Sequence, residues 1–192
     1  MSLICTFVHG YEGVFHPNGE LPALLKSSKD STTFYSYEFP RNPNEFSTTN
    51  LKLIGEKPLK SAKNFDALPR FGFTGHSIED NFIYCGSWNG VYKINLLDFK
   101  CEGLISHRLM NDLHGICISD GIIYTILTGK DTVVMTDLSG EILNTFTINN
   151  DISSIKDDHE LKDYDWRFIS KQFRGATGNF HFNHIQVKGD EI

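Results

Sequence analysis

Two short patterns place an imidazole two residues away from a side-chain oxygen. The first is Asp112-Leu-His114 and the second is His181-Phe-Asn183. Alternate residues of a β-strand point to the same face, so each pair presents its two polar groups together if its segment is a strand. Neutral imidazole combined with carboxylate or amide oxygen can bind a divalent cation, and the same groups can hold a small polar ligand. A similarly placed histidine in an earlier segment extends the candidate metal set to His76, His114 and His181.

A second group of candidate residues is basic. Arg167, Lys171 and Arg174 follow one another at spacings of four and three, which on a helix would place all three on one side. Guanidinium groups bind carboxylate, phosphate or sulfate oxygens. We therefore expect Arg167 and Arg174 to help bind a ligand beside His181 and Asn183. The alternative is a solvated basic face on a surface loop.

The segments that hold the first group are predicted to be antiparallel strands. Asp120-Gly121 stands between two β-rich runs and predicts a type I′ hairpin turn, because both central positions of that turn need positive φ. A second hairpin joins residues 131–137 to residues 141–148. Residues 113–148 thus predict four consecutive antiparallel strands.

This four-strand unit recurs at an offset of 40 residues. Residues 78–84 align with 118–124, and the same offset superposes Gly75 on Gly115. Four strands per unit and a period near 40 are typical of a propeller blade. The sequence predicts one propeller domain with blade 1 at about 3–56, blade 2 at about 71–107, blade 3 at about 112–148, an insertion at 151–178 and the start of blade 4 at 179–192.

Blade 1 is predicted with longer loops than the others. Its expected strands are residues 3–8, 13–16, 32–39 and 50–54, with a loop through Pro17, Pro22 and residues 27–31. Propellers typically close four to eight blades into a ring, which leaves no sheet edge open. We therefore expect either a fragment of a longer protein or a chain that completes its ring by oligomerising.

The blade pattern resembles that of a known group of proteins. It is similar to the inner-strand motif of six-bladed propellers. In that pattern, His or Asp is followed by any residue, His or Asn, a small or polar residue and Ile, and then by an Asp-Gly or Gly-Asp turn. The motif stands here as Asp112-Leu-His114-Gly-Ile116 and His181-Phe-Asn183-His-Ile185. The group includes NHL-repeat, gluconolactonase/regucalcin-like and arylsulfotransferase-like proteins. The resemblance covers roughly residues 70–192 and implies an all-β fold, of which this chain would be the N-terminal portion. The sequence has no strict NHL consensus, and neither the calcium set of gluconolactonases nor the histidine of the sulfotransferases can be assigned.

Composition and charge exclude several classes. The chain of 192 residues has 24 acidic and 18 basic side chains, a net charge of −6 and no basic stripe, which argues against nucleic-acid binding. It has neither an apolar run long enough for a membrane helix nor a secretion leader. The four cysteines fit no paired zinc pattern and are expected to be buried free thiols. We expect a cytoplasmic protein with no membrane or nucleic-acid partner.

These expectations combine into two functional hypotheses. The first strand of each blade lines the channel of a propeller, so Asp112, His114, His181 and Asn183 would converge at the axis. The first hypothesis is a site for a small anionic or polyhydroxylated ligand, with a divalent metal as the candidate cofactor and metal-assisted ester or lactone hydrolysis as the reaction if the protein is catalytic. Whether it is an enzyme stays open, since the sequence has no nucleophile elbow, HExxH or CxxC motif. The second hypothesis is a non-catalytic propeller that binds a protein partner and whose channel histidines are structural.

Overall fold

The computed structural model describes residues 3–7, 23–40, 43–59, 72–128, 131–147, 165–168 and 182–189. In these ranges the protein is mostly antiparallel β-sheet, with a short helix α1 (Pro43–Thr48) and a 3-10 helix η2 (Trp166–Phe168). The predicted all-β class is confirmed. None of the helices in the described ranges has the length and apolar character needed to cross a membrane.

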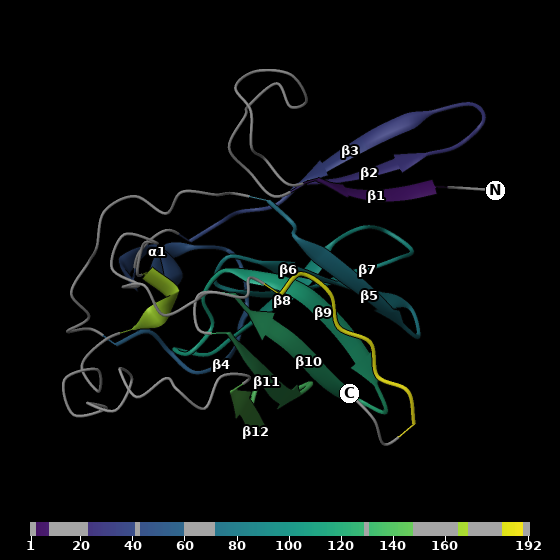
Figure 1. Ribbon diagram of the computed structural model, residues 1–192. Coiled ribbons are helices and arrows are strands. Elements are labelled where there is room, and N and C mark those ends of the chain that lie inside the picture. Colours follow the sequence, from purple (N-terminus) through teal and green to yellow (C-terminus); the bar gives the residue numbers. More distant parts are fainter. Residues whose placement is uncertain are drawn as a thin grey trace.

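The strands of the described ranges form three sheets (Figure 1). The first sheet has the order β1 (Leu3–Phe7), β2 (Ala23–Ser27) and β3 (Thr32–Ser36). The second has the order β4 (Leu53–Gly55), β8 (Cys101–Ser106), β7 (Gly90–Asn95), β6 (Phe82–Ser87) and β5 (Gly75–Glu79). The third has the order β12 (Ile142–Thr147), β11 (Thr132–Asp137), β10 (Ile122–Leu127) and β9 (Leu113–Ser119). Neighbouring strands are antiparallel except β4 and β8, which are parallel.

The predicted hairpins are present in the third sheet. Asp120 and Gly121 have φ angles of 53° and 74°, and Ser119 pairs with Ile122 across the turn. Gly140, in the next hairpin, has a φ of 81°. Because the turn residues adopt the left-handed conformation, β9 to β12 follow one another as neighbours. Strands β5 to β8 form the same kind of meander one repeat earlier.

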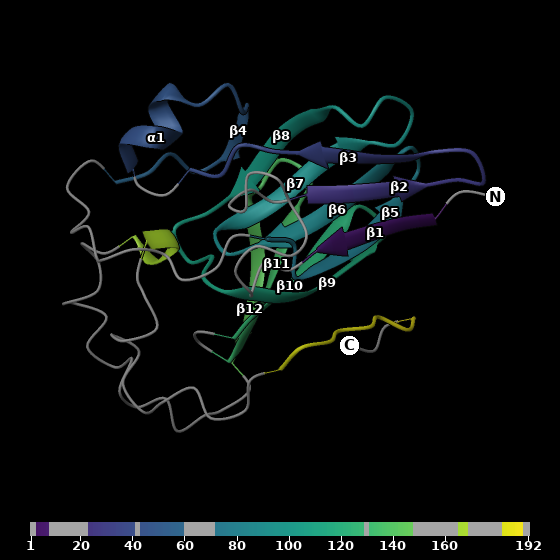
Figure 2. The ribbon, with the colours of Figure 1, turned by 90° about the horizontal axis from the view of Figure 1, so that it is seen from above.

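The second and third sheets pack face to face. Apolar side chains from both sheets fill the space between them, among them Tyr84, Val91 and Ile105 from one sheet and Ile123 and Val134 from the other. Figure 1 and Figure 2 show these two sheets as adjacent layers. The central strands β7, β10 and β11 have buried residues on both faces because each sheet is covered on both sides.

Apolar side chains from other segments of the chain pack against the two outer faces of this pair of sheets. The far face of the second sheet packs against Leu24, Phe39 and Phe46, which come from β2, the segment after β3 and α1. The far face of the third sheet is covered by Phe182 and Ile185, in an extended segment that runs beside β9 (Figure 2). The core of the described protein is therefore a series of stacked layers.

The first strands of the second and third sheets lie side by side. The backbone N–H of Ile118 donates to Oγ of Ser77 at 3.1 Å, and that of Gly121 donates to Oε1 of Glu79 at 3.2 Å. A Cβ atom on Gly75 would lie 2.9 Å from the carbonyl oxygen of His114, so the absence of a side chain permits this approach. This contact positions the start of β9, where the candidate residues lie.

The N-terminal third differs from the predicted blade 1. Residues 23–27, which were expected to lie in or beside a loop, form β2, the middle strand of the first sheet. Residues 50–54 were expected to be the last strand of that blade, but the strand found there, β4, pairs in parallel with β8 of the second sheet. The expected strand 13–16 lies outside the described residues. A β-rich segment can be recognised from its sequence, but its partner depends on packing between distant parts of the chain.

Candidate functional site

Asp112 lies in the connection that leads into β9, with a backbone φ of 54°. Asp adopts this left-handed conformation more readily than most residues. Its N–H donates to the carbonyl of Trp88 at 2.8 Å, and its own carbonyl accepts the N–H of Thr128 at 3.1 Å. The residue is 1% exposed. Hydrogen bonds on both sides of the residue therefore fix the place from which its carboxylate projects.

The carboxylate of Asp112 holds the ring of His114. Its Oδ2 accepts a hydrogen bond of 2.7 Å from Oγ1 of Thr128, and its Oδ1 lies 3.2 Å from Nε2 of His114. The side chain of His114 is 11% exposed. Asp112 lies just before β9 with a left-handed φ, and the register of β9 against β10 shifts at His114, so the two side chains meet through this irregular backbone and not through the alternation of a regular strand.

The second nitrogen of the His114 ring faces another part of the chain. Its Nδ1 lies 2.8 Å from Oδ1 of Asn183, an exposed residue 69 positions later. The backbone of Asn183 lies close to that of Gly115 in β9. A Cβ atom added at Gly115 would be only 3.3 Å from the carbonyl oxygen of Asn183. The structure thus brings Asp112, His114 and Asn183 into one hydrogen-bonded line, and His181 lies outside the described residues.

The third candidate histidine occupies a different position. His76 is on β5 with an exposed side chain. The residue beside the start of β9 is Thr74, whose Oγ1 donates to the carbonyl of Leu113. In the part of the chain that the structure describes, no three His, Cys, Asp or Glu side chains gather as a metal site. The metal set of His76, His114 and His181 stays a prediction, because it includes a residue outside that part.

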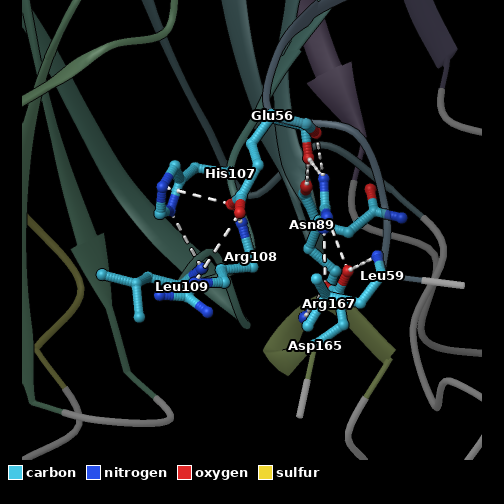
Figure 3. Close-up of polar contacts among 9 residues, drawn as sticks. Glu56, Leu59, Asn89, His107, Arg108, Leu109, Asp165 and Arg167 are labelled. Atoms are coloured by element: carbon cyan, nitrogen blue, oxygen red, sulfur yellow. Dashed lines mark hydrogen bonds and ion pairs between the residues drawn. The ribbon is translucent and has the colours of Figure 1, made fainter. Parts of the chain in front are cut away.

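Arg167, predicted to bind a ligand, lies in the interior. It is 0% exposed and forms two hydrogen bonds with the carboxylate of Asp165, from Nε at 2.7 Å and from Nη2 at 2.5 Å. Its Nη1 donates to the carbonyl of Glu56 at 2.8 Å (Figure 3). The guanidinium is therefore engaged within the protein. Arg174 lies outside the described residues.

These contacts anchor residues 165–168, which we call the anchor segment, near the ends of β4 and β8. The carbonyl of Trp166 accepts a hydrogen bond of 2.6 Å from Nδ2 of Asn111, and its N–H donates to the carbonyl of Arg108 at 2.9 Å. Phe168 packs edge to face against Phe46 of α1. Asn111 directly precedes Asp112, so the loop that holds the anchor segment also leads into the candidate site.

Glu56 organises the same loop through its side chain. Its Oε2 accepts the N–H of Arg108 at 2.9 Å and lies 3.2 Å from Nε2 of His107 (Figure 3). The other ring nitrogen of His107, Nδ1, accepts the N–H of Leu109 at 3.2 Å. Burial lowers the pKa of His107, the Glu56 carboxylate opposes this shift, and the nearby Arg167 and Arg108 guanidiniums favour it. His107 therefore acts as a neutral hydrogen-bonding group in this loop.

A hollow of about 280 Å³ lies apart from these contacts, near α1, and is lined by Glu38, Phe39, Pro40, Glu45, Thr48 and Thr49. The Glu38 carboxylate accepts hydrogen bonds from the hydroxyl of Thr49 and from Asn50. These bonds lower the pKa of Glu38. The carboxylate is thus held in its ionised form by its own neighbours.

Sequence reasoning missed two residues that complete these networks, Thr128 and Asp165. Thr128 follows β10 and reaches Asp112 across the end of the sheet, so its role depends on tertiary structure. Asp165 could have been noticed from its position two residues before Arg167, a spacing that permits a local ion pair.

Comparisons with known proteins add no functional information. No family model and no curated protein matches the chain. Among solved structures, the chain is similar to the computationally designed Ika4 protein, with 17% identity, a TM-score of 0.32 and coverage of 37% of this chain and 44% of that one. It is also similar to the computationally designed Ika8 protein, with 12% identity, a TM-score of 0.34 and coverage of 65% and 46%. The chain thus spans less than half the length of each designed protein.

Proposed function

We propose that the second and third sheets are neighbouring blades of a six-bladed β-propeller, and that the start of β9 is part of a site for a small polyhydroxylated or anionic ligand. Two sheets stacked face to face, with their first strands β5 and β9 side by side, are the arrangement expected of adjacent blades. The hydrogen bond from Ile118 to Ser77 links positions that are 41 residues apart, close to the sequence repeat.

A repeated contact at two glycines supports this proposal. A Cβ atom on Gly75 would lie 2.9 Å from the carbonyl oxygen of His114, and one on Gly115 would lie 3.3 Å from the carbonyl oxygen of Asn183. The start of β9 therefore lies against β5 in the same way that the segment of Asn183 lies against β9. Repetition of one contact from module to module is what a radial architecture requires.

The observation that carries the binding proposal is the hydrogen-bonded line from Asp112 through His114 to Asn183. It begins at a buried carboxylate and ends at an exposed amide, and it joins two segments that are 69 residues apart. A partly exposed imidazole whose ring is oriented by a buried carboxylate on one side and an amide on the other is suited to binding polar ligands, because the directions of its two ring nitrogens are fixed.

Ligand-induced stabilisation tests this proposal. The protein is heated with glucose, myo-inositol, phosphate, sulfate or citrate, and with Zn²⁺ or Ca²⁺ to test the predicted metal. We expect one of these compounds to raise the midpoint of unfolding of the wild type but not of His114→Ala. His184→Ala, which removes an exposed imidazole next to Asn183, is the matched control and should respond like the wild type.

The same experiment addresses the alternative of a protein-interaction propeller. In that case no compound stabilises the wild type, and His114→Ala changes only the stability of the protein. Metal-assisted hydrolysis of an ester or lactone is retained only if Zn²⁺ or Ca²⁺ stabilises the wild type and this effect is lost in His114→Ala.

A further inference from the structure

We infer that Asn144 is an edge cap of the third sheet: its side chain takes the place of a fifth strand and prevents β12 from pairing with β4 of another copy of this chain. The second sheet has five strands and the third has four, and the difference is β4, which pairs with the outer side of β8. β12 lies at the end of the third sheet, with β11 as its strand neighbour in the described part of the chain (Figure 1). The inference concerns this edge and does not depend on the proposed ligand site.

β8 and β12 are equivalent strands, and a bulge at the same place in each fixes their alignment. The pairing of β8 with β7 skips the residue directly before Gly103, and the pairing of β12 with β11 skips the residue directly before Asn144. Gly103 and Asn144 therefore occupy equivalent positions. The residues that follow them, Leu104 and Thr145, are equivalent as well.

The backbone N–H group that follows this position has a different acceptor in each sheet. In the second sheet, the N–H of Leu104 donates to the carbonyl of Lys52, directly before β4, at 2.9 Å. In the third sheet, the N–H of Thr145 donates to Oδ1 of Asn144 at 2.8 Å. A side-chain amide and a peptide group have the same kind of acceptor oxygen. Asn144 thus supplies to β12 the acceptor that β8 receives from its neighbouring strand.

The side chain of Asn144 also occupies the space that a strand like β4 would need. A Cβ atom on Gly103 would lie 2.5 Å from Cδ1 of Ile54 and 2.9 Å from the carbonyl oxygen of Lys52. β4 can approach β8 because residue 103 has no side chain. Asn144 has a Cβ atom at the equivalent position, so a strand placed on β12 as β4 is placed on β8 would collide with it.

β12 needs such protection because its composition otherwise favours pairing with another strand. The strand Ile142–Thr147 has no charged residue and no proline, and Leu143 and Phe146 are 50% and 44% exposed. An exposed edge strand with these properties is prone to associate with other chains. Because β4 pairs with the equivalent edge of β8, β4 of a second copy is the strand that the cap excludes.

Amide hydrogen exchange, followed by NMR, tests the hydrogen-bonding part of the cap. Asn144→Leu keeps a side chain of similar size but has no acceptor oxygen. We expect the protection factor of the Thr145 amide to fall about fivefold in this variant, as for the loss of one hydrogen bond. Asn144→Asp, which keeps the acceptor, is the matched control and should retain the wild-type protection factor.

Asn144→Gly tests the exclusion of a strand, because it removes both the acceptor and the side chain. The probe is a fluorescent peptide with the sequence of residues 50–56, which contains β4. We expect the glycine variant to bind this peptide about tenfold more tightly than the wild type. Sedimentation velocity should show reversible association of Asn144→Gly at concentrations where the wild type and Asn144→Leu do not change in mass. β8 is the same in every variant and gives the same background.

Either of two results would overturn the inference. If the Thr145 amide is equally protected in the wild type and in Asn144→Leu, the side chain does not cap the edge. If Asn144→Gly binds the peptide no more tightly than the wild type and associates no more strongly, the side chain does not exclude a strand. Circular dichroism establishes that the glycine variant is folded. If it is not folded, the exchange measurement on Asn144→Leu decides.

Discussion

The guanidinium of Arg167 and the carboxylate of Asp165 form a paired set of hydrogen bonds inside the protein, where both side chains are 0% exposed. The carboxylate also accepts the N–H of Leu59 at 3.2 Å. A single pair of charges thus joins the anchor segment to the residues that follow β4. Removing one member of such a pair strongly destabilises a protein, because the remaining charge is then buried without a partner.

Replacing Arg167 by Met should therefore lower the free energy of unfolding by about 3–5 kcal/mol. The double variant Asp165→Leu with Arg167→Met should lose less, because it leaves no unpaired charge. Urea unfolding followed by circular dichroism measures both effects. Lys100→Met is the matched control, since its pair with Asp98 is exposed and its removal should leave stability unchanged within error. An Arg167→Met protein as stable as the wild type would show that the pair does not hold the anchor segment.

Stability should fall as the pH decreases below about 6.5, the ordinary pKa of histidine. The pKa of His107 is lowered in the folded protein, chiefly by burial, so the unfolded chain takes up a proton at a pH where the folded protein does not. The unfolded state then binds more protons, and the free energy of unfolding decreases with decreasing pH.

The variant His107→Asn tests this assignment because it keeps an acceptor for the N–H of Leu109 without a titrating ring. The unfolding free energy of the variant, measured between about pH 7.5 and 5, should depend less on pH than that of the wild type. His184→Asn, at an exposed position, is the control. Equal slopes for His107→Asn and the wild type would assign the pH dependence to other groups.

Gly75→Ala should destabilise the protein by about 1–3 kcal/mol, because the new methyl group would meet the carbonyl oxygen of His114 at 2.9 Å and force β5 and β9 apart. Gly86→Ala is the control in the neighbouring strand, where the nearest atoms would lie at 3.8 Å, and it should change stability little. Thermal unfolding measures both variants. If the Gly75→Ala and Gly86→Ala proteins are equally stable, β5 and β9 are not closely packed.

The thiols of Cys85 and Cys101 should react slowly with iodoacetamide in the native protein. Burial raises the pKa of the Cys85 thiol well above its ordinary value and raises that of Cys101 to about 11, so little of the reactive thiolate exists near neutral pH. Peptide mass spectrometry after timed labelling measures each site. Both should become reactive in urea, and rapid native labelling of Cys85 would contradict its position in the core.

The sequence was most informative where local signals agree with one another. The hairpin of β9 and β10 was predicted because Asp120-Gly121 both separates two β-rich runs and adopts the positive φ angles that a type I′ turn needs. Strand alternation also predicted that Asp112 and His114 lie together, but Asp112 precedes β9 with a left-handed φ, so the observed contact has a different backbone origin. The approach of Asn183 required only the further assumption that the modules repeat.

Features that depend on distant partners could not be predicted in this way. The basic spacing of Arg167, Lys171 and Arg174 is the same for a solvated face and for a buried pair, and only the packing around Asp165 and Glu56 shows that Arg167 is internal. The parallel pairing of β4 with β8 likewise depends on contacts with a strand far along the chain. The local preference of a segment for strand or helix does not determine which distant strand or side chain it will contact.

The parallel pairing of β4 has a consequence for the order in which the sheets assemble. Strands β9 to β12 are joined by short turns, so their contacts can form early at a small loss of chain entropy. β4 and β8 are neighbours in the sheet, but strands β5 to β7 separate them in the sequence. Their pairing therefore closes a long loop and is expected to be a slow, non-local step. Until it occurs, the outer edge of β8 has unpaired backbone groups, and the newly made chain is most prone to associate with other chains during that interval.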